Sequence, residues 1–294
     1  MKMKEVHKSK LGFSLKIFMP QGEPDGIKII EKSNWTGQGI SFPRALFAEA
    51  RKREELKKTG VYILMGPGEK DSFPRIYVGE GDPVLPRLDQ HMRNKDFWTH
   101  AIVYISKDLN LNKAHVQYLE ARLISLAADA KRCVLDNGNI PQLPTLSEAD
   151  TVDVETFLSE MLTCLPVLGI NFFEKPKPHV KNVIKLFIKS KGITAEGYES
   201  AEGFVVCANS MAVKEEVPSL SRYARYIRKA LIDSGVFVDK GKYYQLSQDY
   251  LFSSPSAAAS IVLGNESNGR TEWKDASGRT LKEIQTELTK ANNI

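Results

Sequence analysis

The side chains best suited to chemistry lie between residues 60 and 120. Tyr62 and Tyr77 lie in two short apolar runs of the chain. Arg87 and His91 follow four positions apart, so a helix would place them on one face. A guanidinium can hold phosphate oxygens, and an imidazole can accept or relay a proton. This set of side chains therefore suits the chemistry of a phosphate ester.

Glu120 is a carboxylate inside an apolar stripe of a predicted helix. The stripe has helical spacing and consists of Val116, Leu119, Leu123 and Ala127. A carboxylate that faces a core needs a partner, and an arginine would serve. Each of the five candidate residues also has a purely structural interpretation when it is taken alone. Only their occurrence together favours a function.

Taken in order, these residues resemble the GIY-YIG nuclease family over about Thr59 to Asn139. That family has a Gly-Ile-Tyr strand, a Tyr-Ile-Gly strand, an Arg and often a His in the next helix, and a Glu in a later helix. The corresponding residues here are Gly60-Val61-Tyr62, Tyr77-Val78-Gly79, Arg87, His91 and Glu120. Valine in place of isoleucine keeps a β-branched residue in each strand.

One segment departs from the family pattern. A small polar residue often follows the second motif, where this chain has Glu80-Gly81-Asp82-Pro83. Carboxylates beside a phosphate site repel DNA unless they hold a metal or point away. Glu80 and Asp82 are therefore not included in the predicted catalytic set.

The resemblance implies a metal-dependent endonuclease that hydrolyses DNA phosphodiester bonds, with RNA not excluded. Glu120 would hold Mg²⁺ or Mn²⁺, and Arg87 would clamp the non-bridging oxygens. Activation of the attacking water falls to Tyr62, as a phenolate favoured by nearby positive charge, or to Tyr77 or His91. The alternatives are a catalytically silent nucleic-acid-binding module that keeps the nuclease fold, and a structural adaptor.

The C-terminal part, about residues 183–288, resembles a domain of unknown function that is found appended to GIY-YIG nucleases. The segments that carry this resemblance include 195–197, 203–206, 252–259 and 268–281. A helix predicted over Ser221 to Ser234 is basic, and its face would hold the DNA backbone or simply be solvated. Trp273 is expected in a core. The basic residues are Arg222, Arg225, Arg228 and Lys229.

The elements that must position these residues follow from hydrophobic patterning and turn signals. Strands are predicted over 13–19, 26–31, 61–65, 76–79 and 101–106, and helices over 44–58, from 83 or 86 to 93, 111–131 and 152–168. Because a hairpin joins 61–65 to 76–79, the sheet is mixed or antiparallel. In the C-terminal part, strands are predicted over 183–190, 203–207, 243–246 and 270–273, and helices over 221–234, 255–262 and from Thr280.

These elements predict an α/β (α+β) class: a small three-stranded sheet flanked by helices, followed by a second small α+β domain. The expected divisions are an N-terminal extension (1–58), the nuclease domain (59–140), a helix with a basic linker at 174–179 (141–182) and the C-terminal domain (183–294). The N-terminal part would cut and the C-terminal part would hold the substrate.

Composition bounds the class of protein. The 294 residues are 42% hydrophobic and 26% charged, as in ordinary globular proteins, and the formal charge of +5 permits contact with a polyanion without demonstrating it. The polar start, Met1 to Lys10, and the absence of a long apolar run favour a cytoplasmic protein. Three widely spaced cysteines fit reduced thiols.

Overall fold

The structure is a computed structural model that describes residues 12–68, 73–108, 110–175 and 183–291. The chain divides into two compact units, one of residues 1–68 and 74–173 and the other of residues 69–73 and 174–294. Helices and strands are mixed in both units, which confirms the α+β class. The segment 1–10 and most of the linker predicted over 174–179 lie outside the described residues.

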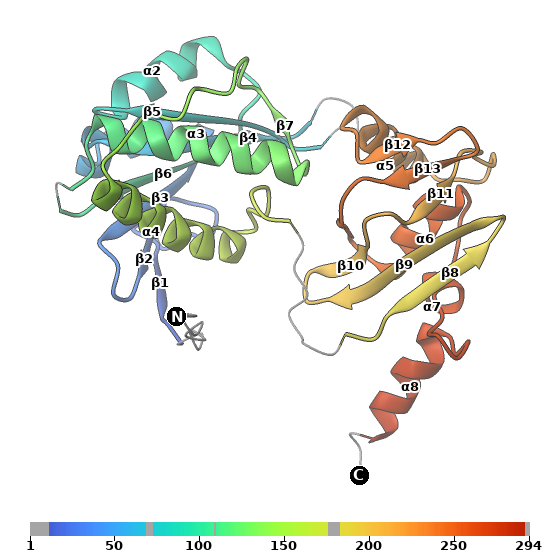
Figure 1. The fold of residues 1–294 in the computed structure, drawn as a ribbon. Coiled ribbons are helices and arrows are strands. Elements are labelled where there is room, and N and C mark those ends of the chain that lie inside the picture. The colour runs from blue at the N-terminus through green and yellow to red at the C-terminus, as the bar shows by residue number, and fades with distance from the viewer. Residues whose placement is uncertain (1–11, 69–72, 109, 176–182, 292–294) are drawn as a thin grey trace, which may run out of the picture. The chain divides into compact units, whose positions relative to one another are not determined.

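Seven strands of the first unit form one mixed sheet in the order β1-β2-β3-β6-β4-β5-β7 (Figure 1). Neighbouring strands are antiparallel, apart from β5 and β7, which are parallel. The strands are β1 (Leu15–Phe18), β2 (Lys28–Lys32), β3 (Gly37–Pro43), β4 (Gly60–Gly66), β5 (Arg75–Gly81), β6 (His100–Ser106) and β7 (Val134–Leu135).

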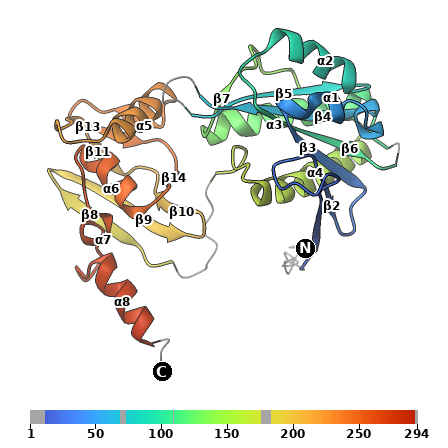
Figure 2. The ribbon, with the colours of Figure 1, turned by 180° about the vertical axis from the view of Figure 1, so that it is seen from behind.

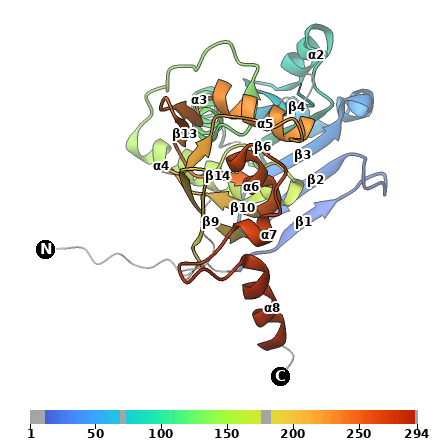
Figure 3. The same ribbon diagram turned by 90° about the vertical axis from the view of Figure 1, so that its right-hand side faces the viewer.

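The three-stranded sheet predicted from the sequence is therefore too small. Strand β3, which the patterning missed, pairs with β6 from Gly37 to Pro43 and brings in the β1–β2 hairpin, whose strands lie side by side in Figure 3. Two glycines and a proline weaken the strand signal of β3, yet its Ile40 and Phe42 are fully buried. The first strands thus belong to the sheet that carries the candidate site.

The two faces of this sheet pack against different helices. Helices α3 (Lys113–Ala130) and α4 (Glu148–Cys164) cover one face (Figure 1), and α1 (Phe47–Ala50) and α2 (Leu85–Asn94) lie on the other, which Figure 2 shows from behind. Successive residues of a strand point to opposite faces. Val61 and Ile63 therefore join the core beneath α3, whereas Tyr62 joins the core beneath α2.

The single helix predicted over 44–58 is wrong. The segment consists of the short helices η1 (Arg44–Leu46), α1 and η2 (Glu54–Lys57), with Arg53 in an extended conformation between the last two. Both Phe47 and Leu56 are buried in the same core. Nine residues of continuous helix would put them about 180° apart, so the break at Arg53 is what allows both to reach the core. A further short helix, η3 (Leu165–Leu168), ends α4.

The second unit combines two small antiparallel sheets with helices. The first sheet has the order β14-β10-β9-β8 and the second the order β11-β13-β12. The strands are β8 (Leu186–Ser190), β9 (Ile193–Ser200), β10 (Gly203–Val206), β11 (Met211–Val213), β12 (Phe237–Asp239), β13 (Tyr243–Leu246) and β14 (Tyr250–Phe252). The helices are α5 (Arg222–Asp233), α6 (Pro255–Leu263), α7 (Gly269–Glu272) and α8 (Leu281–Ala291).

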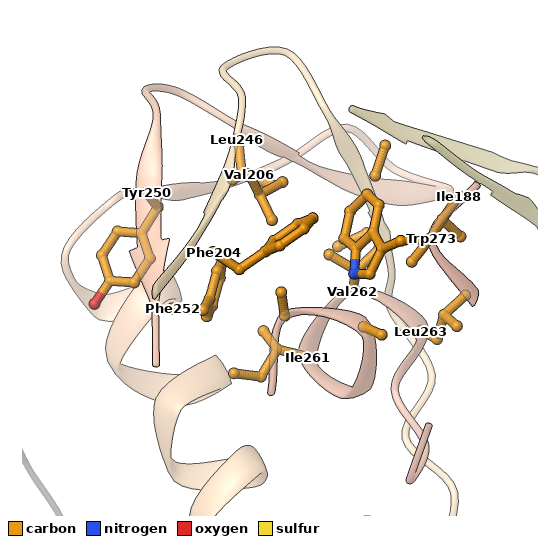
Figure 4. Packing of buried hydrophobic residues seen from close by; sticks show 14 of the residues in the cluster. Ile188, Phe204, Val206, Leu246, Tyr250, Phe252, Ile261, Val262, Leu263 and Trp273 are labelled. Carbon is orange, nitrogen blue, oxygen red and sulfur yellow. The ribbon is translucent and has the colours of Figure 1, made fainter. Parts of the chain in front are cut away.

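Aromatic side chains organise the core of this unit. Phe204 and Trp273 lie against each other with ring centroids 4.5 Å apart (Figure 4), and the Trp273 indole donates a hydrogen bond to the Pro255 carbonyl at 3.0 Å. The prediction that Trp273 is a core residue is confirmed. The strand predicted over 270–273 is wrong, because the Asn268 side chain accepts from the Arg270 amide and begins α7 instead.

Within the described ranges, the structure has no helix that is both long enough and apolar enough to cross a bilayer.

Candidate active site

Tyr62 on β4 and His91 on α2 form a buried pair. Tyr62 is only 1% exposed, and its Oη lies 2.7 Å from Nε2 of His91. The helix is placed there by Leu88, which is fully buried in the same core as Tyr62. One hydrogen bond therefore joins two residues of the motif set, one from β4 and one from α2.

Gly79 makes room for the Tyr62 phenol. The two residues are partners across β4 and β5. A Cβ added to Gly79 would lie 2.4 Å from both Cζ and Oη of Tyr62, so the ring lies directly against the backbone of β5. The glycine of the second motif is thus required by close approach and not by an unusual backbone angle.

The variant Gly79→Ala should therefore lower both stability and any activity of the site. The added methyl must displace the Tyr62 ring, because the strand backbone beneath it cannot move freely, and overpacking of this kind costs about 1–3 kcal/mol. A chemical denaturation curve measures that loss. Gly138→Ala is the matched control, since nothing lies within 4 Å of its added Cβ. Equal midpoints for the two variants would contradict the close approach.

Tyr77 completes a cluster of three rings. Its ring centroid is 4.8 Å from that of His91 and 6.3 Å from that of Tyr62. Tyr77 is half-buried, whereas the other two rings are buried. Of the two phenols, Tyr77 is the one that a bound molecule can reach.

Burial sets the protonation of this cluster. Burial, together with the neighbouring Tyr77, raises the pKa of Tyr62 far above its ordinary value, and the charge of Arg87 offsets this only in part. Burial followed by the charges of Lys95 and Arg87 lowers the pKa of His91 to about 4. At neutral pH both side chains are uncharged. The expectation that local cations favour a Tyr62 phenolate is therefore wrong, because desolvation outweighs them.

Glu120 lies at the margin of the core, on α3. Val116, Leu119, Leu123 and Ala127 are buried as predicted, while Glu120 itself is half-buried. Burial and the nearby charge of Glu80 raise the pKa of the Glu120 carboxyl to about 7, against the opposing effect of Lys113 and Arg87. Within the described parts of the chain its carboxylate makes no hydrogen bond or ion pair. The arginine partner that the structural interpretation required is not found there.

Arg87 is exposed on α2 and connects the parts of the site through its charge. Its guanidinium lowers the pKa of both phenols and of Glu120. The Glu120 carboxylate acts on the same two phenols in the opposite sense. The charges of Arg87 and Glu120 thus both act on Tyr62 and Tyr77, and the charge of Arg87 also acts on His91. These are the five residues that the sequence motifs single out.

The two acidic residues after β5's Gly79 have different surroundings. Glu80 is 8% exposed, and both its oxygens accept from Nζ of Lys113 at 2.6 Å. Asp82 is exposed and accepts from the Thr59 hydroxyl at 2.5 Å. Lys113, the first residue of α3, thus neutralises the charge of Glu80. The sequence analysis did not predict this pairing.

Asn137 is a supporting residue that sequence reasoning missed. Its side-chain oxygen accepts from the Val78 amide at 3.0 Å and its amide donates to the Val78 carbonyl at 2.8 Å. This pair of bonds continues the pairing of β5 beyond the short strand β7. It holds the strand between Tyr77 and Gly79 at the sheet edge. Only its place at the end of the motif region would have suggested it.

The basic face predicted on helix α5 is wrong for Arg228. Its side chain is fully buried and donates to the carboxylate of Glu216 and to the carbonyls of Val213 and Ile261. Arg225 likewise donates to three backbone carbonyls that precede the helix. Both guanidiniums are consumed in holding the fold. Of the four residues, Arg222 and Lys229 are exposed, and Lys229 pairs with Asp233 at 2.5 Å.

A single divalent cation fits the donor chemistry at Glu120. In the portions described, no three acidic, histidine or cysteine side chains gather into a metal-binding group. Mg²⁺, however, commonly keeps several waters and uses one or two protein carboxylates together with substrate phosphates. The charge of a half-buried carboxylate without a hydrogen bond, whose ionisation is disfavoured by burial, would be stabilised by such a cation.

Comparisons with known proteins assign only the second unit. Residues 186–285 match the family model of a domain of unknown function, DUF4357. This agrees with the resemblance expected for residues 183–288. The matched region runs from the start of β8 into the first half of α8, and its core contains the Phe204–Trp273 contact. No GIY-YIG family model matches the chain. No curated protein and no solved structure matches it either.

Proposed function

We propose that the first unit is a metal-dependent endonuclease that hydrolyses DNA phosphodiester bonds. The observation that carries the proposal is the Tyr62–His91 hydrogen bond of 2.7 Å in a cluster whose phenols both experience the charges of Glu120 and Arg87. A proton acceptor, a carboxylate and a guanidinium thus occur together. These are the groups that attack of water on a phosphate diester requires.

In this proposal Nδ1 of His91 accepts the proton of the attacking water, while Nε2 carries its own hydrogen and donates it to the Tyr62 hydroxyl oxygen. Its imidazole is neutral at pH 7, which a base requires, whereas the buried Tyr62 phenol holds its proton too tightly. Tyr62 then has the role of fixing the orientation of the imidazole through their hydrogen bond. Tyr77, which is half-exposed, would contact the phosphate.

In this proposal Arg87 binds the negatively charged phosphate and Glu120 binds the metal cation. The exposed Arg87 fork can bind two non-bridging oxygens and stabilise the charge that accumulates as the new P–O bond forms and the old one breaks. Glu120 would hold Mg²⁺ or Mn²⁺, which when bound supplies Lewis-acid stabilisation of the leaving oxygen. Of the four candidate cations on α5, Arg225 and Arg228 serve the fold, so any contact of this helix with DNA would rest on the exposed Arg222 and Lys229.

The full chain should cleave labelled DNA only when a divalent cation is present. A panel of duplex, nicked, flapped and single-stranded DNA, with RNA as a further substrate, is incubated with Mg²⁺, with Mn²⁺ or with EDTA, and products are resolved by size. We expect cleavage with either metal and none with EDTA. Binding of DNA without cleavage under every condition would overturn the proposal in favour of the catalytically silent module.

A further inference from the structure

Lys95 lies against the ring cluster although no sequence motif includes it. It follows the last residue of α2, and its Nζ is 4.4 Å from the centroid of the Tyr77 ring. An ammonium at this distance from an aromatic face is attracted by the ring quadrupole. Tyr77 is the half-exposed ring of the cluster. Lys95 therefore contacts the most exposed ring of the cluster.

The position of Lys95 is itself fixed from two sides. Its Nζ bonds one oxygen of Asp136, while Arg75 bonds the other oxygen. The backbone amide of Asp136 donates to the Ile76 carbonyl at 2.7 Å, which attaches this carboxylate to β5. On the main-chain side, Arg44 donates to the carbonyl of Lys95. The Lys95 ammonium is thus held by an ion pair to a carboxylate that is itself attached to β5.

We propose that Lys95 is a further positioning residue of the candidate site, whose ammonium, clamped by Asp136, holds the Tyr77 ring against His91. The same ammonium supplies positive charge beside the imidazole. The groups that act on or contact His91 are Arg87 on α2, Lys95 directly after that helix, Asp136 after β7, and the phenols from β4 and β5. The two cations outweigh the one carboxylate, which is consistent with a neutral imidazole. The catalytic consequence of Lys95 depends on the proposed function, but its effect on His91 does not.

The first test is an NMR titration of the His91 ring in the full chain. Lys95→Met removes the charge and keeps much of the stem, so the His91 midpoint should rise from about 4, by on the order of one pH unit. Lys95→Arg should leave it near the wild-type value. Arg75→Met is the matched control, because Arg75 shares Asp136 but stacks on Phe97 instead of Tyr77.

The second test is kinetic. Lys95→Met should lower kcat by on the order of tenfold with KM little changed, since misplacement of a contacting group acts on the chemical step. Lys95→Arg should recover most of that loss. Lys95→Gln, checked for folding by circular dichroism, is a second variant that lacks the charge. Lys95→Gln should show the same rise of the His91 midpoint and the same fall of kcat. If Lys95→Met does not fold, Lys95→Gln provides both tests.

Two results would overturn the inference. The first is a His91 titration that does not move in either uncharged variant. The second is a raised KM with unchanged kcat, which would make Lys95 a DNA contact. If the wild-type chain cleaves nothing, the proposed function fails, yet the titration still decides whether Lys95 positions the cluster.

Discussion

Replacing Glu120 with glutamine is expected to reduce metal-dependent cleavage by roughly a thousandfold at limiting Mg²⁺. Glutamine keeps the shape of the side chain and removes the charge. The Lewis-acid contribution of a bound cation amounts to several kcal/mol, which corresponds to a factor of about 10³ in rate. The measurement is single-turnover cleavage across a Mg²⁺ series. Asp129→Asn, an exposed change on the same helix, is the control and should behave as wild type.

The raised pKa of Glu120 adds a distinctive dependence on pH. With a pKa of about 7 in the absence of metal, the carboxyl is largely protonated at pH 6 and ionised at pH 8. Protons and Mg²⁺ therefore compete for it, so apparent Mg²⁺ affinity should rise with pH through this range. Increasing Mg²⁺ should move the midpoint of activity to lower pH. A Glu120→Gln variant with unchanged rate and unchanged Mg²⁺ dependence would remove Glu120 from the metal site.

The sequence predicted which residues meet, because their partners are set by regular elements. Tyr62 and Gly79 face each other once β4 and β5 pair as a hairpin, and Arg87 and His91 share a face of α2 by helical spacing. Local patterning and pairwise geometry were sufficient there.

The sequence did not predict how deeply these groups are buried. Tyr62 is buried in a core to which β3 and the broken segment 44–58 also contribute, and β3 reaches it only through long-range pairing with β6. Helix propensity over 44–58 is high, but the need to bury both Phe47 and Leu56 overrides it. Because these contributions to the core were missed, the phenol was expected to ionise more easily than the structure allows.

Arg228 illustrates a limit of a different kind. Spacing places it beside Arg225 on helix α5, which is typical of a basic surface. What removes it from that surface is Glu216 together with backbone carbonyls from β11 and α6, which provide partners for a buried guanidinium. Arginine is seldom fully buried without such partners. Helical periodicity alone contains no information about carbonyls supplied by other elements.

The conservative replacement Arg87→Lys is expected to lower kcat by about a hundredfold to a thousandfold, while KM changes little. Arg87 is exposed, so its replacement should not disturb the core, and lysine retains the charge that attracts DNA. Lysine cannot, however, present the planar fork that binds two phosphate oxygens at once. Loss of one preformed donor to developing charge costs about this much in other hydrolytic reactions. Steady-state kinetics on the cleaved substrate separate the two parameters, with Arg93→Lys, exposed on the same helix, as the control.

A raised KM with unchanged kcat would show that Arg87 binds DNA equally in the ground state and the transition state. The transition-state role would then fall to the groups beside it, Tyr77 first, because its phenol is the other accessible donor of the cluster.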